Sequence, residues 1–169
     1  MRSVEIECRR FIAAEPSQAF ALSLDPEAFP AWFRGKGLVP AVVRVTRLED
    51  GPLRAGSRRR VESSDGNSVE ETVLELDPPR RHRYRIAGFA PPFGWLVACA
   101  EADWHWTPRA EGVVVCWRYR YHPRGWLVRP IIGFIARRDF AAAMQACLDA
   151  LAASAVEPRR TAPQSSRKV

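Results

Sequence analysis

The chain has few cysteines, and their spacing argues against paired-thiol chemistry. Cys8, Cys99, Cys116 and Cys147 are widely separated, and none belongs to a motif for zinc binding or thiol exchange. We therefore expect free thiols, buried or half-buried, in a reducing cytoplasm. The chain also lacks a Gly-x-Ser-x-Gly motif and a glycine-rich phosphate loop. These absences point away from a serine hydrolase of that kind, and we expect no cofactor.

Long apolar runs are also missing. The longest weakly charged run, residues 86–100, contains Pro91, Pro92 and glycines, so it is too short and too broken to cross a bilayer. The first ten residues alternate charged with apolar side chains, unlike a signal peptide. We expect a cytoplasmic protein with no integral membrane association.

Lysine is scarce, because only Lys36 and Lys168 occur, although the formal net charge is +7. Four of the cations lie in residues 157–169, which are rich in Pro, Ser and Gln and which we predict to be a disordered basic tail after one domain at residues 1–156. The remaining arginine surplus indicates a compositional bias of the source. No nucleic-acid-binding module is recognisable, so we expect no nucleic-acid partner.

Two alternating runs predict an antiparallel hairpin. Val113, Val115, Trp117, Tyr119 and Tyr121 share one parity, and residues 96–106 alternate in the same way before a loop at residues 107–112. A turn centred on residues 109 and 110 would set Ala102 opposite Trp117, Ala100 opposite Tyr119 and Ala98 opposite Tyr121. Alanines beneath aromatic rings either pack against those rings or leave room for a ligand, and both interpretations stay open.

The rest of the chain predicts one strand, two short helices, four more strands before the hairpin, and a long helix. Proline near a helix start and Asp25 as an N-cap mark the short helices. Strands are predicted at residues 4–12, 41–49, 57–63, 68–76 and 81–86, and the helix at 130–155. We predict an α+β fold in which a curved, seven-stranded antiparallel sheet wraps around the C-terminal helix. Pockets are favoured between these two layers.

Several turns and helix starts carry a resemblance to a known family. They are residues 12–20, Asp25-Pro-Glu-Ala-Phe-Pro-Ala-Trp32, residues 50–57, residues 76–84 and residues 106–112. Together they resemble the polyketide cyclase/dehydrase family of the START-like (SRPBCC), helix-grip superfamily, over residues 4–155. The resemblance implies an apolar cavity for a small hydrophobic or aromatic molecule. It carries over no catalytic residue.

Four polar residues are candidate catalytic groups. Arg59 and Glu71 have the inward parity of adjacent strands, where an unpaired charge is costly, so each needs the other or a ligand. His82 and Tyr84 share the parity of Ile86 and could exchange protons with a substrate. The competing interpretation places the ion pair at the sheet edge in water and His82 at the rim.

The predicted ligand-binding residues are mostly aromatic. They are Arg10, Trp104, Trp106, Trp117, Tyr119, Tyr121, Phe134 and Met144. Glu101, Asp103 and His105 also share a strand face, but this face lies opposite the apolar one, so we expect an ion pair of Glu101 with Arg118 and no metal site.

Three functions therefore remain open. The preferred hypothesis is a cyclase- or dehydratase-like enzyme that folds a polyketide-like substrate in the cavity. The second is a non-catalytic lipid or quinone carrier or a ligand sensor, and the third is a protein-interaction module whose cavity is filled by side chains. The expected partner is a small hydrophobic molecule, with the protein a monomer or a homodimer.

Overall fold

A computed structural model describes residues 3–156, and the predicted basic tail lies outside these residues. The strands are β1 Val4–Ile12, β2 Val42–Arg47, β3 Arg58–Ser63, β4 Ser68–Asp77, β5 Arg81–Ala87, β6 Val97–Arg109 and β7 Gly112–Pro123. The helical segments are α1 Pro16–Ser23, α2 Phe29–Trp32, α3 Phe93–Leu96, α4 Arg129–Ile135, η1 Ala136–Phe140 and α5 Ala141–Val156. The predicted fold class is confirmed.

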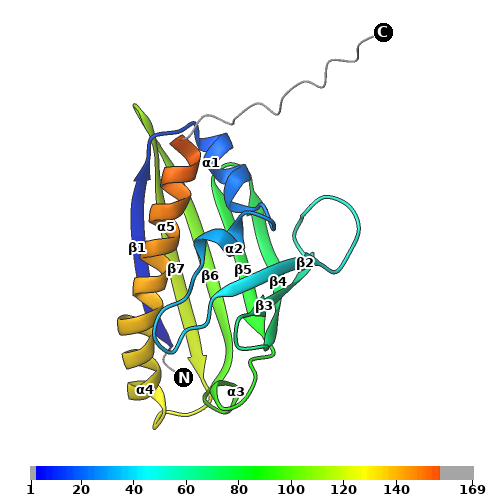
Figure 1. The fold of residues 1–169 in the computed structure, drawn as a ribbon, viewed down its shortest axis with the longest axis vertical. Coiled ribbons are helices and arrows are strands. Elements are labelled where there is room, and N and C mark those ends of the chain that lie inside the picture. Colours follow the sequence, from blue (N-terminus) through cyan, green and yellow to red (C-terminus); the bar gives the residue numbers. More distant parts are fainter. Residues whose placement is uncertain (1–2, 157–169) are drawn as a thin grey trace, which may run out of the picture.

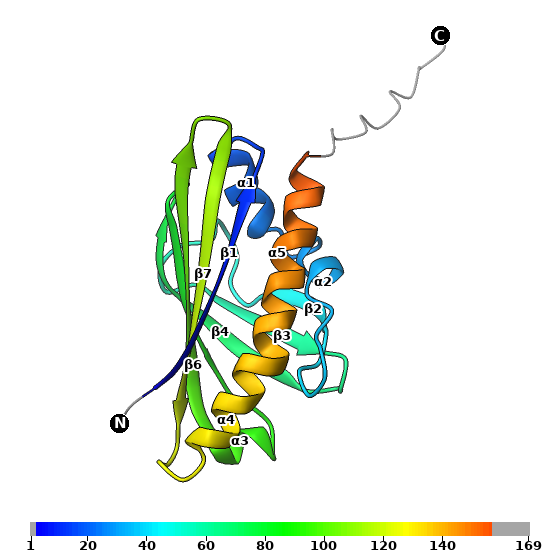
Figure 2. The ribbon, with the colours of Figure 1, turned by 90° about the vertical axis from the view of Figure 1, so that its left-hand side faces the viewer.

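All seven strands form one antiparallel sheet in the order β1-β7-β6-β5-β4-β3-β2. Helix α5 runs beside β1, while β2 and β3 curve round on the other side (Figures 1 and 2). Helices α1 and α2 also contact α5. Helix α5 therefore packs against the β1 side of the sheet and lies away from the strands on the β2 side.

The predicted hairpin forms, but its register is wrong by two residues. Ala102 lies opposite Tyr119, Ala100 opposite Tyr121 and Trp104 opposite Trp117. The turn is centred on residues 110 and 111, because Arg109 pairs with Gly112. A shift of two residues keeps every side chain on its predicted face, since side-chain direction alternates with a period of two. The alanines therefore still lie beside large aromatic residues, but beside different ones.

The predicted ion pair of Glu101 with Arg118 changes with the register. Glu101 lies opposite Arg120, and Asp103 is the residue opposite Arg118. Arg118 donates instead to Glu7 on β1, with its Nη2 2.9 Å from the carboxylate. The outward faces of β1 and β7 are thus joined by exposed ion pairs.

The C-terminal helix contains a π-helical turn at η1 that the sequence did not predict. Such turns insert one residue and rotate the side chains on either side of it relative to one another. After the turn, Met144, Cys147, Leu148 and Leu151 are buried within the fold. Residues 129–156 are long and apolar enough to cross a membrane, but half of the relevant window is buried in the fold, as in the core helix of a folded domain.

Candidate functional site

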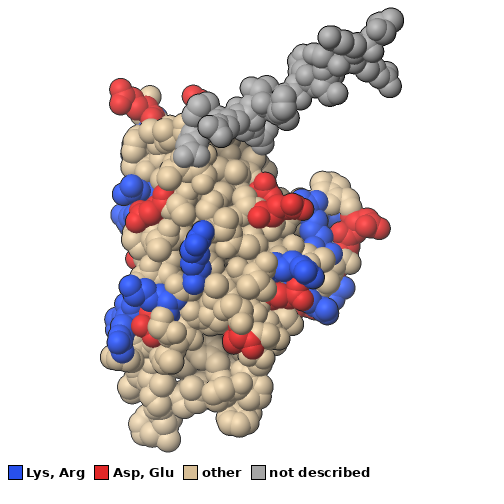
Figure 3. All heavy atoms as spheres, viewed as in Figure 1, with Lys and Arg blue, Asp and Glu red and all other residues tan. Residues whose placement is uncertain are grey.

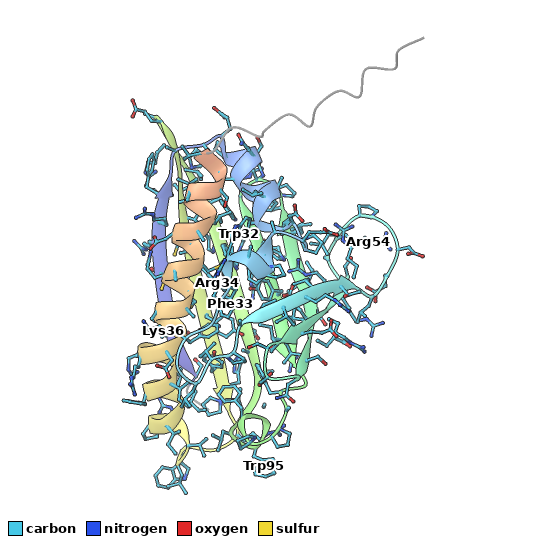
Figure 4. All side chains as sticks on the ribbon, in the orientation of Figure 1. Trp32, Phe33, Arg34, Lys36, Arg54 and Trp95 are labelled. Carbon is cyan, nitrogen blue, oxygen red and sulfur yellow. The ribbon has the colours of Figure 1, made fainter. Side chains whose placement is uncertain are left out.

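A cavity of about 430 Å³ lies between the inner face of the sheet and the segments that cover it. Its wall combines strands β2 to β7, η1, and the loops at residues 38–40 and 89–92. Phe33 follows α2 and lies over the sheet (Figure 4), where it is part of this wall. The volume falls within the range of small-molecule sites. The aromatic side chains therefore do not fill the space between sheet and helix.

Arg59 and Glu71 form a buried ion pair in the cavity wall. They lie directly opposite each other on β3 and β4, and are only 8% and 5% exposed. The Nε of Arg59 donates to Oε1 of Glu71 at 2.8 Å, and its Nη2 contacts the same oxygen. Burial raises the pKa of Glu71, and the guanidinium of Arg59 opposes that shift. The inward parity of both residues places this pair at the cavity.

His82 lies beside this pair in the wall. It is 4% exposed, and its Nε2 is buried without a hydrogen-bond partner among the described residues. Burial and the positive charge of Arg59 lower the pKa of His82 to about 3. The imidazole is therefore neutral at physiological pH. His82 pairs with Trp104 across the sheet, so the strand holds it inside the fold and away from the rim.

Tyr84 continues the polar cluster toward the aromatic wall. Its ring lies 4.9 Å from that of His82, and its hydroxyl accepts a hydrogen bond of 3.4 Å from Nε1 of Trp104. Burial raises the pKa of the Tyr84 phenol far above its ordinary value. Arg59, Glu71, His82 and Tyr84, which we call the polar cluster, thus lie together in one part of the cavity wall.

An aromatic wall adjoins the polar cluster. The rings of Trp104 and Trp117 are stacked 4.2 Å apart, and Tyr119 lies 4.8 Å from Tyr121. All four residues line the cavity. The Tyr119 and Tyr121 rings are tilted by 52° to each other, so the wall combines ring faces and edges, and such a mostly apolar surface suits an aromatic molecule.

The structure places four of the predicted ligand-binding residues outside the cavity. Arg10 forms an exposed ion pair with Asp149 of α5, at 3.3 Å. Trp106 packs against Phe20 of α1, because β6 extends past the cavity there. Met144 is completely buried between helix and sheet, and Phe134 is 55% exposed on the outer face of α4.

The sequence interpretation missed most of the covering segments. Phe89, Phe93 and Leu96 come from the apolar run around α3, while Leu38 and Phe140 come from the loop after α2 and from η1. Phe140 and Leu96 belong to the predicted helix and hairpin, but Leu38, Phe89 and Phe93 lie in short segments rich in proline and glycine, and this composition was the available signal. Periodicity could not place these three residues, because such segments are too short to show a repeat.

The carboxylates of β6 contact arginines on the outer face of the sheet. Asp103 accepts hydrogen bonds from Nε and Nη2 of Arg81, at 3.1 and 2.9 Å, and this contact lowers its pKa against the effect of burial. His105 lies 3.2 Å from the same carboxylate. Within residues 3–156, no three His, Cys, Asp or Glu side chains are grouped so as to hold a metal ion.

A curved antiparallel sheet, a long C-terminal helix and a cavity between them define the helix-grip class of ligand-binding proteins. The chain belongs to the family described as polyketide cyclase / dehydrase and lipid transport, which it matches over residues 3–156. This match confirms the resemblance seen in the turns and helix starts. No curated protein sequence matches the chain.

Solved structures share the fold at low sequence identity. The di-domain ARO/CYC protein StfQ from the steffimycin biosynthetic pathway is 20% identical with a TM-score of 0.69, over 90% of this chain and 51% of that one. Norcoclaurine synthase from Thalictrum flavum is 14% identical with a TM-score of 0.69, over 94% and 96% of the two chains. Major latex-like protein 151 from Panax ginseng is 12% identical with a TM-score of 0.68, over 92% and 99%. These similarities establish the fold, and the ligand has to be inferred from the residues of the cavity.

Proposed function

We propose that the cavity binds a small, largely apolar, aromatic or polyketide-like molecule and that the protein acts on it as a cyclase- or dehydratase-like enzyme. The observation that carries the proposal is the buried polar cluster in a mostly apolar wall. Burying a charged pair and an unpartnered imidazole nitrogen costs folding free energy. A bound carbonyl, enol or phenol would give these groups hydrogen-bond partners.

The cluster contains the groups that proton transfer at a β-diketone requires. Removal of a proton from the carbon between two carbonyls leaves an enolate, whose negative charge a nearby guanidinium such as Arg59 stabilises. The neutral imidazole of His82 can accept a hydrogen bond or the proton itself. The aromatic wall would hold the rest of the substrate in a compact conformation, which favours ring closure.

The family match and the ARO/CYC structure support this assignment. Both concern proteins named for cyclase chemistry on the same fold. For this chain the substrate class follows from the cavity: the wall of indoles and phenols favours aromatic rings, and the polar cluster favours oxygen atoms beside it.

Benzoylacetone, an aromatic β-diketone, tests the proposal. Its binding can be followed through the fluorescence of the wall tryptophans, and its keto–enol conversion through ultraviolet absorbance. We expect saturable binding and conversion faster than in buffer. His82→Gln should reduce the acceleration by about a hundredfold, the lower range for loss of a general base. His105→Gln, on the outer face, is the matched control and should change nothing.

Carriage without catalysis is the second candidate, and the low pKa of His82 favours it. A base with a pKa of about 3 takes a proton poorly at neutral pH, and Glu71 is held by Arg59. Saturable binding of benzoylacetone with no acceleration would establish this function and exclude the enzyme. Absence of binding of benzoylacetone and of the apolar dye 8-anilinonaphthalene-1-sulfonate would contradict both.

A further inference from the structure

Large apolar side chains are exposed at the end of the molecule that carries α3 and α4. Five of them form what we call the apolar tip, and each is 53% to 76% exposed: Trp95, Trp126, Leu127, Ile131 and Phe134. Arg124 joins the two segments of the tip, because its backbone N donates to the carbonyl of Leu96 and its Nε to that of Gly94, both at 2.8 Å. Figure 4 shows Trp95 at the extremity of this end. The tip is therefore one surface built from two connected segments, one around α3 and one that leads into α4.

Helix α4 exposes an apolar face to water. Ile131 and Phe134 on α4 and Leu127 in the turn before it follow one another at spacings of four and three, and all are exposed. Ile132 and the first residue of η1, Ala136, lie on the opposite face and are buried. A helix at the surface of a soluble domain normally exposes polar residues. An exposed apolar face of this kind marks an interaction surface.

The charged residues within the two segments that form the tip are all basic. Residues 112–138 contain no Asp or Glu, and residues 86–100 contain no charged residue at all. Arg124, Arg137 and Arg138 are exposed next to the tip, and the guanidinium of Arg138 lies 5.4 Å from the ring centre of Phe134. Figure 3 shows this end as largely uncharged, with a group of cations and two acidic patches beside it. An anionic partner complements this surface, whereas a second copy of the chain would bring like charges together.

We propose that the apolar tip docks onto the surface of an anionic lipid bilayer. Tryptophans insert at the headgroup level of a bilayer, where an amphipathic ring contacts both acyl chains and water. The apolar face of α4 would lie in the same plane, as interfacial helices do, and the arginines would contact lipid phosphates. The protein is then peripheral: the tip enters the interface and no segment crosses the membrane.

Docking in this orientation would connect the cavity to the bilayer. Phe93 and Leu96 line the cavity, while Trp95 between them is exposed at the tip. Ile135 lines the cavity in the same way, next to the exposed Phe134. The segments that contact lipid on one side thus form the cavity wall on the other. Exchange of a ligand between membrane and cavity is a consequence that rests on the proposed function, whereas docking itself does not.

Co-sedimentation of the full chain with vesicles tests docking without any ligand. We expect binding to phosphatidylcholine vesicles that contain about 30% phosphatidylglycerol, and much weaker binding to phosphatidylcholine alone. Trp95→Ser combined with Trp126→Ser should weaken binding about tenfold or more, and Arg137→Glu combined with Arg138→Glu should do the same. The tryptophan emission of the wild type should shift to the blue on binding, and that of the tryptophan double variant should shift less.

Matched controls lie away from the tip. Phe11→Ser removes an apolar side chain of similar exposure beside the β6–β7 turn, and Arg54→Glu reverses a charge in the loop that projects from the sheet (Figure 4). Every variant keeps residues 157–169, so their cations contribute equally. The proposal is overturned if the wild type does not bind anionic vesicles, or if the tip variants and the control variants bind them with the same affinity. A different result would assign the surface to a second copy of the chain: the wild type is a dimer in sedimentation equilibrium, both tip variants are monomers, and the wild type does not bind vesicles.

Discussion

The carboxylate of Asp139 accepts a hydrogen bond from the backbone N of Leu38, at 3.1 Å, across 101 residues of sequence. Asp139 lies in the π-helical turn η1 and is buried, while Leu38 lies in the loop that covers the cavity. Gly37 approaches so closely that a Cβ there would lie 2.6 Å from the same carboxylate, and its φ of +56° is left-handed. The π turn therefore fixes the covering loop to the C-terminal helix.

Removal of this carboxylate should loosen the covering loop. Asp139→Ala leaves the Leu38 N–H without its acceptor, and we expect a loss of about 1–3 kcal/mol in the free energy of unfolding. Asp139→Asn keeps an acceptor oxygen of the same size and should lose less. Urea denaturation gives the stability, and amide hydrogen exchange should show faster exchange in residues 35–40 for the alanine variant. Equal exchange in the wild type and the alanine variant would contradict the assigned role.

Loss of the arginine from the buried pair should destabilise the fold strongly. Arg59→Met leaves the carboxylate of Glu71 buried without its partner, which costs about 3–5 kcal/mol. The double variant Arg59→Met with Glu71→Leu removes both charges and should recover most of this loss. Urea denaturation of the two variants and the wild type measures these differences. If the double variant is no more stable than the single variant, the cost is one of packing instead of charge.

The single variant should also show a stronger pH dependence of stability than the wild type. Without the guanidinium, burial alone acts on Glu71, and its pKa in the folded state rises further above the unfolded value. The folded state then holds the proton more tightly than the unfolded state does. Its stability is therefore greatest below the unfolded pKa and falls as pH rises through the interval between the two pKa values. The double variant should lack this fall.

The sequence predicted the sheet and the positions of the polar cluster because alternation is a local property. Arg59, Glu71, His82 and Tyr84 have the inward parity, and the structure places all four in the cavity wall. The predicted face of each residue was correct even where the β6–β7 register was wrong by two residues, because a shift of two leaves each side chain on the same face of the sheet. Whether an inward residue reaches the cavity depends on how far the sheet extends beyond it.

The extent of the cavity along each strand could not be predicted from parity. Arg10 has the parity of Ile6 and Cys8, yet it lies where β1 passes the edge of α5 and pairs with Asp149 in water. Trp106 has the parity of Trp104, yet it lies under α1. These differences arise from contacts between residues distant in sequence, which no local pattern encodes. The π turn could not be predicted from the sequence either. It changes the helical periodicity by only one residue, which the spacing of apolar residues does not reveal.

Stability at acid pH should report on the buried imidazole of His82. Its pKa is lowered to about 3, so the unfolded state binds a proton below pH 6.5 that the folded state does not. Stability is therefore complete above about pH 6.5 and should fall by up to about 1.4 kcal/mol per pH unit as pH decreases toward 4. His82→Phe removes both the titrating group and the unpartnered Nε2, and it should flatten this dependence. Urea denaturation between about pH 4 and 7 measures the slope for each protein.

His105→Gln provides the matched comparison for this slope. The side chain of His105 is 43% exposed beside Asp103 on the outer face of β6, so its substitution leaves the cavity and the buried imidazole of His82 untouched. An equal reduction in slope for both variants would show that the acid sensitivity does not come from the cavity.

Reduction of the cavity volume should weaken ligand binding without loss of stability. Val69 on β4 is half-buried, lines the cavity and lies opposite Val61, so Val69→Trp can direct an indole into the open space instead of into packed core. We expect the dissociation constant for benzoylacetone to rise about tenfold or more, because the ligand loses room against the aromatic wall. Val43→Trp adds the same ring at an exposed position on β2, outside the cavity, and should leave binding unchanged. Isothermal titration gives both constants, and thermal unfolding shows whether each variant keeps the stability of the wild type. Equal affinities in the two variants would place the ligand outside this cavity and contradict the site, whereas a selective loss in Val69→Trp would tie binding to the space beside the polar cluster.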